Sequence, residues 1–162
     1  MCLDPKENEA RRLKKKMTVY KTAMLMEPDK KGEVILSVFQ AFRYIPGKKY
    51  RCKEFKKEVD DMYKVYYGFH SYRSYGGALA NAITGVSRPD VILRCEIPAG
   101  SWIYQSKDSA EWCSDRIRVT GWRVYDKQKR EWENGWRTPE PGVFAKIARG
   151  IRKKLSGLWP FS

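Results

Sequence analysis

Few side chains of this sequence are suited to acid–base chemistry, and His70 stands first among them. It is the single histidine of the 162 residues, and it follows Gly68 and Phe69 near the end of a predicted strand. An imidazole at a strand end can act as a general base. It can equally be a structural residue with satisfied hydrogen bonds, which is the more common case.

The cysteines offer no metal site. Cys2, Cys52, Cys95 and Cys113 are far apart in the sequence, and the spacings typical of zinc ligands are absent. The sequence therefore predicts no bound metal and four reduced thiols. Cys95 lies at an inward position of a predicted strand, so we expect it in the core.

Positive charge is the most pronounced property of the composition. The formal net charge is +14, from 33 basic and 19 acidic side chains. Residues 1–16 contribute +3 and residues 143–162 contribute +5 to this balance. An acidic partner is expected: nucleic acid, an acidic protein surface or anionic lipid. The residues expected to contact it are Arg11, Arg12, Lys14, Lys15, Lys16, Lys146, Arg149, Arg152, Lys153 and Lys154. The alternative is a protein that is merely basic.

Aromatic and basic residues alternate in two stretches, residues 66–75 and 122–137. Exposed rings beside arginine or lysine can stack bases and hold phosphates. The same rings can instead fill a core while the charges face water. No recognised nucleic-acid-binding motif is present.

These residues must be positioned by a central unit of strand, short helix and strand. Residues 63–72 are rich in aromatic and β-branched residues and predict a strand. Apolar spacing within residues 78–83 predicts a short helix. Residues 91–97 alternate with period two, which predicts a strand with Val91, Leu93, Cys95 and Ile97 facing the core.

Further strands are predicted on both sides of this unit. Residues 18–26 and 34–44 are expected to pair antiparallel, and residues 102–105 and 115–126 to form two more strands. Gly121 is expected to host a bulge within the last of these. Residues 131–136 are expected to form the returning strand or an aromatic turn. Residues 106–114 are expected to contain a helical turn, and residues 4–7 resemble a helix start.

The sequence thus predicts one α+β domain with an antiparallel or mixed sheet and a short helix after the GFH strand. We expect a basic N-terminal arm over residues 1–17, a globular domain over residues 18–138, and a basic amphipathic helix and tail over residues 139–162. That helix can pack on the sheet, dock on a partner or oligomer mate, or lie on an anionic membrane surface. No bilayer-spanning run and no signal-peptide core occur, so an intracellular or virion-associated protein is expected.

Five short motifs carry a resemblance to known proteins: VYK (19–21), GFHSY (68–72), ALANA (78–82), VILRCEIPAG (91–100) and SDRIRV (114–119). In this order they resemble a group of small, uncharacterised proteins of phages and bacteria, over roughly residues 18–125. The resemblance implies a shared fold and supplies no activity.

A more distant likeness is to ADP-ribosyltransferases, which place a glycine–aromatic strand before a helix. This likeness implies NAD as cofactor, bound by Gly68 and Tyr72, with His70 and Glu133 as catalytic residues. Ser71 or Ser74 would match a serine motif. The family's histidine branch needs a histidine on an earlier strand, and none precedes His70.

The leading hypothesis is a small phage-type interaction module without a cofactor, which binds nucleic acid or a nucleoprotein assembly. The alternatives are an NAD-using ADP-ribosyltransferase-like enzyme and a structural virion or assembly protein. The sequence leaves enzymatic activity, partner identity and oligomeric state open.

Overall fold

A computed structural model of the chain describes residues 5–7, 9–29, 32–37, 42–57, 65, 67–84 and 89–139. Over these ranges the protein is an antiparallel β-sheet of eleven strands with one short α-helix. The antiparallel sheet and the helix after the GFH strand are therefore confirmed. The predicted C-terminal helix lies outside the described residues, together with Lys146, Arg149, Arg152, Lys153 and Lys154.

The strands follow one path through the sheet, in the order β1-β8-β9-β6-β2-β7-β10-β11. β3 pairs with β2 and β4, and β5 pairs with β10. Every pairing is antiparallel. The elements are β1 (Arg11–Arg12), β2 (Met17–Asp29), β3 (Gly32–Ser37), β4 (Arg43–Tyr44), β5 (Lys49–Arg51), β6 (Phe69–Tyr72), α1 (Tyr75–Thr84), β7 (Val91–Ile97), β8 (Trp102–Gln105), β9 (Glu111–Ser114), β10 (Arg116–Asp126) and β11 (Glu131–Trp132).

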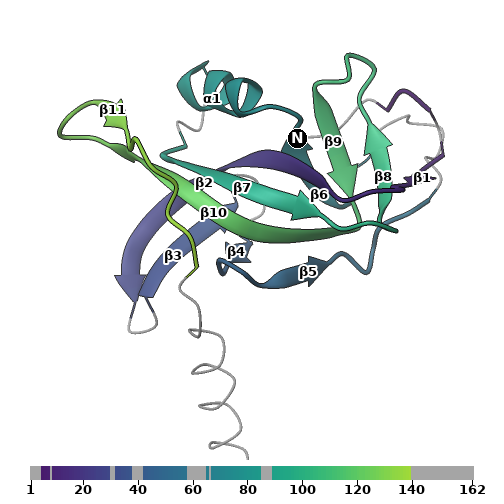
Figure 1. Cartoon of the computed structure of the whole chain (residues 1–162), viewed down its shortest axis with the longest axis horizontal. Helices are drawn as coiled ribbons and strands as arrows, with labels where there is room; N and C mark the ends of the chain where they lie inside the picture. The colour runs from purple at the N-terminus through teal and green to yellow at the C-terminus, as the bar shows by residue number, and fades with distance from the viewer. Residues whose placement is uncertain are drawn as a thin grey trace, which may run out of the picture.

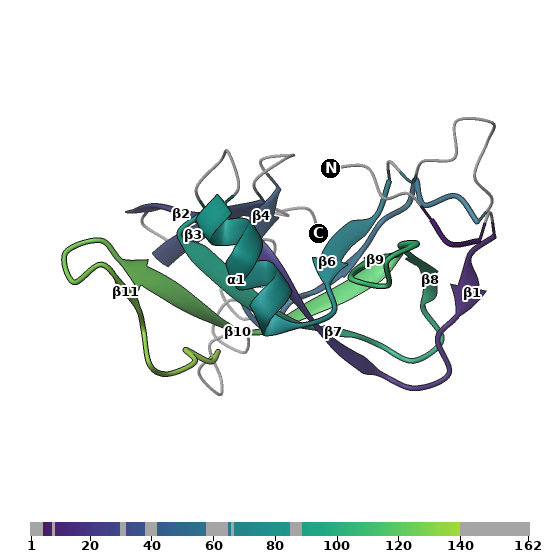
Figure 2. The ribbon, with the colours of Figure 1, turned by 90° about the horizontal axis from the view of Figure 1, so that it is seen from above.

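The main core lies on one face of the curved sheet. Its members come from β2, β3, β4, β6, β7, β8, β9 and β10, and include Val19, Leu93, Ile103 and Val119, each at most 1% exposed. Figure 1 shows α1 on one side of the central strands β2, β7 and β10, and β3, β4 and β5 on the other. Figure 2 shows α1 and the β8–β9 pair over different parts of the sheet.

Helix α1 covers part of the opposite face of the sheet. It packs on β2, β6 and β7 and buries Ala78 in one cluster with Tyr72 and Ile92. Ala82 of the same helix is also buried. Its start is capped, because the Gly77 N–H donates to Ser74 Oγ at 3.0 Å. The alternation in β7 predicted Ile92 on the outward face, and α1 explains why Ile92 is nevertheless fully buried.

The predicted bulge in β10 is confirmed. The register against β7 shifts between Val119 and Gly121, which inserts one extra residue. Ile117 and Val119 precede the bulge, and Trp122 and Val124 follow it. All four contact the main core cluster, because the extra residue reverses the alternation of faces.

Two local predictions are wrong. Residues 5–7 and 9–17 form no helix: Pro5 bridges Ser106, and Arg11–Arg12 is a strand on the edge of β8. The segment 106–114 contains strand β9 in place of a helical turn. In both cases hydrogen bonds to a distant neighbouring strand outweigh the local helix signals, as at Lys6 N–H, which donates to the Gln105 carbonyl at 2.7 Å.

Candidate functional site

His70 lies in the middle of β6, opposite Cys113 of β9. It is half-buried, and both of its ring nitrogens are shielded from solvent. Ser71 points to the other face of the strand, where its hydroxyl donates to the Trp112 carbonyl at 3.3 Å. Ser74 is occupied as the cap of α1. Neither Ser71 nor Ser74, the two serines named in the sequence analysis, is therefore placed as the acid–base partner of His70.

Gly68 and Tyr72 have packing roles in the structure. Gly68 has φ +135°, and a Cβ at this position would lie 2.4 Å from Cys113 Sγ and 3.0 Å from Phe55. Tyr72 is 7% exposed under α1. Burial, and secondly the charge of Glu111, raises the pKa of the Tyr72 hydroxyl. Neither residue lines a cavity that the structure describes.

Glu133 is remote from His70. It follows β11, and the strands β2, β7 and β10 lie between β11 and β6 in the sheet. Its carboxylate accepts two hydrogen bonds from Arg137, at 2.5 Å from Nη2 and 3.0 Å from Nε. The sequence-predicted catalytic pair is thus not brought together, and Glu133 has the geometry of a bidentate ion pair.

The N-terminal basic residues lie on the edge of the sheet. The guanidinium of Arg12 lies 4.8 Å from the Trp102 ring centroid, and the Lys57 amine lies 4.7 Å from the same ring. Arg11 lies 5.4 Å from the Trp112 ring and donates to the Gln105 side chain at 2.9 Å. Arg11 and Arg12 therefore pair with aromatic rings, and neither forms an ion pair with a residue that the structure describes.

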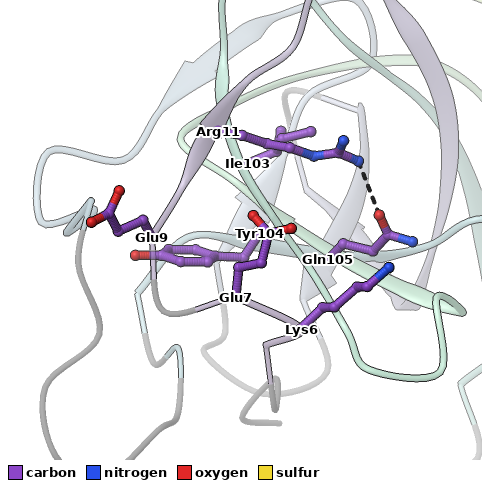
Figure 3. A pocket seen from close by; sticks show the side chains of 7 residues that line it. All are labelled: Lys6, Glu7, Glu9, Arg11, Ile103, Tyr104 and Gln105. Carbon is purple, nitrogen blue, oxygen red and sulfur yellow. Dashed lines mark hydrogen bonds between the residues drawn. The ribbon is translucent and has the colours of Figure 1, made fainter.

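Figure 3 shows the pocket beside this edge, with Lys6, Glu7 and Glu9 around the Tyr104 ring and the Arg11–Gln105 hydrogen bond. Its volume is about 60 Å³. Pockets that bind small ligands usually measure some 300 Å³ or more, so this polar recess does not hold a nucleotide.

The next three lysines differ in their pairing. Lys16 forms an ion pair with Glu96 at 3.3 Å. Lys14 and Lys15 are exposed and form no ion pair with any residue that the structure describes. The segment from Arg11 to Lys16 therefore keeps most of its positive charge available to solvent.

A second group of cations lies on the sheet itself. Ile117 is buried in the main core and Tyr50 packs against it, so their strand neighbours point to the opposite face. These neighbours are Lys49 and Arg51 of β5 and Arg116 and Arg118 of β10. We call these four residues the basic face.

The basic face places like charges directly opposite one another. Arg116 pairs with Arg51, and Arg118 pairs with Lys49, in the register of β5 and β10. Like charges in such positions destabilise a sheet, each by roughly 0.2–1 kcal/mol. Arg116 Nε forms an ion pair with Asp115 at 3.6 Å. Arg118 has Glu96 opposite it on its other side, in β7. Lys49 and Arg51 form no ion pair with any residue that the structure describes.

The N-terminal segment and the basic face are neighbours. The Gly100 N–H donates to the Leu13 carbonyl at 2.8 Å. On its other side, Arg116 Nη2 would lie 3.6 Å from a Cβ on Gly100. Lys16 is joined through Glu96 to Arg118, since Glu96 and Arg118 are paired across β7 and β10. The two groups of cations are therefore linked through Gly100 and through Glu96.

A lysine also lies inside the core. Lys21 of β2 is 8% exposed, and its amine donates to the His70 carbonyl and lies 5.9 Å from the Tyr44 ring. Burial lowers the pKa of Lys21. Burial likewise raises the pKa of the Cys95 thiol to about 12, and raises that of Cys113 further. This group is enclosed and no described cavity reaches it.

The sequence analysis missed the basic face. Its signal is the pattern basic–apolar–basic, which occurs as Lys49-Tyr50-Arg51 and again as Arg116-Ile117-Arg118. Each pattern predicts a strand with two cations on one face. The adjacency of the two segments follows from the pairing of β5 with β10, which no local pattern specifies.

Over the described residues, the structure thus defines an antiparallel β-protein with cations on its N-terminal edge strand and on the outward face of β5 and β10. Comparison of the chain with protein-family models, curated proteins and solved structures finds no match. Within the described ranges, no three potential ligands gather as a metal site would need. No helix there has the length and apolarity to cross a membrane.

Proposed function

We propose that this protein binds a polyanion, in the first place nucleic acid, through the basic face and the N-terminal basic segment. The observation that carries the proposal is the pair of opposed like charges between β5 and β10. The repulsion within each of these pairs is relieved when a polyanion supplies further negative charge.

The surrounding geometry supports the same proposal. The cations of the basic face project from paired strands, so their spacing is fixed by the sheet. Arg12 is held against Trp102 and Arg11 against Trp112. Contacts between such cations and the phosphates of a nucleic acid do not depend on its base sequence. We therefore expect binding without sequence preference.

The test is a salt titration of binding to labelled duplex DNA and RNA. We compare the full chain with the triple variant Lys49→Gln, Arg51→Gln, Arg118→Gln. Each lost phosphate contact lowers the slope of log K against log salt by about 0.9 on duplex DNA. The expected slope is therefore lower by about 2 to 3 in the triple variant.

A matched control removes three charges elsewhere: Lys127→Gln, Lys129→Gln, Arg130→Gln. These residues follow the far end of β10, about 30 Å from Arg118 at 3.3 Å per strand residue. The control leaves the slope within about 1 unit of the wild type. Binding that does not depend on salt, or equal slopes in both triple variants, contradicts the proposal.

The other two hypotheses have direct tests of their own. A thermal shift with NAD tests the ADP-ribosyltransferase-like alternative, whose two catalytic candidates lie on strand β6 and after strand β11, with three strands between them. The solution mass at high concentration tests a structural virion or assembly role. The phage-type assignment rests on the five short motifs and remains a prediction.

A further inference from the structure

Two arginines and a tryptophan form a stack beside α1. Arg94 of β7 and Arg123 of β10 place their guanidiniums 5.1 and 5.7 Å from the centroid of the Trp136 ring. Both arginines alternate with core residues of their strands, so both lie on the outward face. The rings of Tyr20 and Tyr75 surround Trp136 at 6.0 and 5.8 Å.

The two guanidiniums are half-buried and have no carboxylate partner among the residues that the structure describes. The nearest acidic residues are engaged elsewhere: Glu133 with Arg137 and Glu96 with Lys16. Arg123 Nε donates to the Glu133 carbonyl at 2.7 Å. This hydrogen bond leaves the terminal N–H groups of Arg123 to donate to another acceptor. Withdrawing positive charge from water without a counter-charge is unfavourable, so the arrangement calls for an anion.

The backbone is shaped to hold the stack in place. Residue Gly121 lies opposite Arg94 in the sheet, and a Cβ there would lie 3.3 Å from Arg94 Nη2 and 2.9 Å from the Arg137 carbonyl. Two backbone hydrogen bonds between Trp122 and Arg137, of 3.0 and 2.9 Å, fix the chain that carries Trp136. The guanidinium planes are thereby preorganised, and such planes bind phosphate oxygens in a bidentate manner.

We propose that the Arg94–Trp136–Arg123 stack is a binding site for a phosphate group. Two sources share this chemistry: a phosphodiester of the nucleic-acid backbone and a terminal or free phosphate monoester. The first source rests on the proposed function, since Arg94 lies in the next cross-strand row to Arg118 on the same face. The second source is independent of it.

The experiment keeps the positive charge of the two side chains and replaces the planar guanidinium group. In the full chain, Arg94→Lys with Arg123→Lys preserves two cations over the indole ring but removes the planar fork. Inorganic phosphate is titrated against chloride at constant ionic strength by calorimetry. The wild type binds phosphate saturably, and the double variant binds at least ten-fold more weakly. The matched control, Arg51→Lys with Arg118→Lys, changes phosphate affinity less than two-fold. Equal affinity in wild type and the Arg94 and Arg123 variant, or no saturable binding by the wild type, overturns the proposal.

Oligonucleotides with a 5′-phosphate or a 5′-hydroxyl then separate the two sources. A preference of five-fold or more for the 5′-phosphate, lost in the Arg94 and Arg123 variant, supports the monoester. Equal affinity for the two oligonucleotides, reduced in that variant, supports the phosphodiester. Oligonucleotide binding that the variant leaves unchanged refutes the phosphodiester source while the proposed function stands. Phosphate binding without any nucleic-acid binding refutes the proposed function while the site stands.

A second measurement covers the case in which the double variant does not fold. Phosphate is expected to change the tryptophan fluorescence of the wild type, because it alters the cations around Trp136. The change is expected to disappear in Trp136→Phe, whose folding is checked by circular dichroism. The same fluorescence change in both proteins overturns the proposal.

Discussion

At the residue scale, Gly68 shows how a position that looks functional in sequence acquires a structural explanation. Glycine before an aromatic residue matched the pattern of a cofactor-binding strand. In the structure, its φ of +135° and its contact with Cys113 account for the glycine completely. Neither the backbone angle nor the distant cysteine can be derived from the local sequence.

This explanation predicts that Gly68→Ala destabilises the protein by about 2 kcal/mol or more, through backbone strain and overpacking. Chemical denaturation measures the free energy of unfolding. The matched control is Gly135→Ala, where a Cβ would meet nothing within 4 Å. We expect the control to change stability by less than about 0.5 kcal/mol. Similar values for the two variants would mean that Gly68 is not constrained.

The buried amine of Lys21 predicts a pH-dependent stability. Burial lowers the pKa of Lys21 in the folded state below the usual 10.5. At pH values between the folded-state pKa and 10.5, the unfolded chain therefore holds a proton that the folded chain lacks. Stability conferred by this group therefore rises with pH in that window and is lowest below it. The groups facing Lys21 are Cys95, Cys113, Glu111 and Tyr44.

Lys21→Met removes this dependence. We expect the stability of the variant relative to the wild type to be greatest near pH 6 and to decline toward pH 10, by up to about 1.4 kcal/mol per pH unit within the window. The raised pKa values of Cys95 and Cys113 reduce stability above about pH 9 in both proteins, so this effect cancels in the comparison. A difference that is constant from pH 6 to pH 10 would show that Lys21 titrates normally.

At the element scale, the strands predicted most accurately are those whose pattern lies within their own residues and the turns beside them. The bounds of β7 and β8 were predicted to the residue, since strict alternation defines β7 and the turn residues 98–100 separate it from β8. Strand β9 was misread as a helical turn, because Trp112 and Cys113 gain their strand conformation from pairing on both sides, with β6 and β8. Pairing between distant strands is a tertiary effect that local propensity does not contain.

The pairing of β5 with β10 predicts that stability and affinity change in opposite directions. Lys49→Glu replaces a like-charge pair with an opposite-charge pair facing Arg118. The free protein should gain about 0.2–1 kcal/mol in the free energy of unfolding, while affinity for duplex DNA falls. Lys49→Gln should give intermediate values for both quantities. A loss of stability in Lys49→Glu would refute the repulsion on which the proposed function rests.

At the scale of the whole molecule, the sequence predicted the charge but not its arrangement. The N-terminal cations from Arg11 to Lys16 were identified from composition alone, and the structure joins them to the basic face through Gly100. The four cations of the basic face were missed, because their proximity depends on the fold. The stack of Arg94, Trp136 and Arg123 was missed for the same reason: it combines three segments that are distant in the sequence.

The predicted contribution of residues 143–162 can be separated from that of the basic face. The variant with Lys146, Arg149, Arg152, Lys153 and Lys154 all changed to Gln removes five charges and changes no residue of the described sheet. If both surfaces contact the polyanion, the salt slope of this variant falls, and binding persists through the basic face. Combining it with Lys49→Gln, Arg51→Gln and Arg118→Gln should then reduce log K by the sum of the two separate losses, if the two sets of cations contact the polyanion independently. Complete loss of binding in the C-terminal variant alone would place the whole interaction in that segment and remove the sheet from the proposed function.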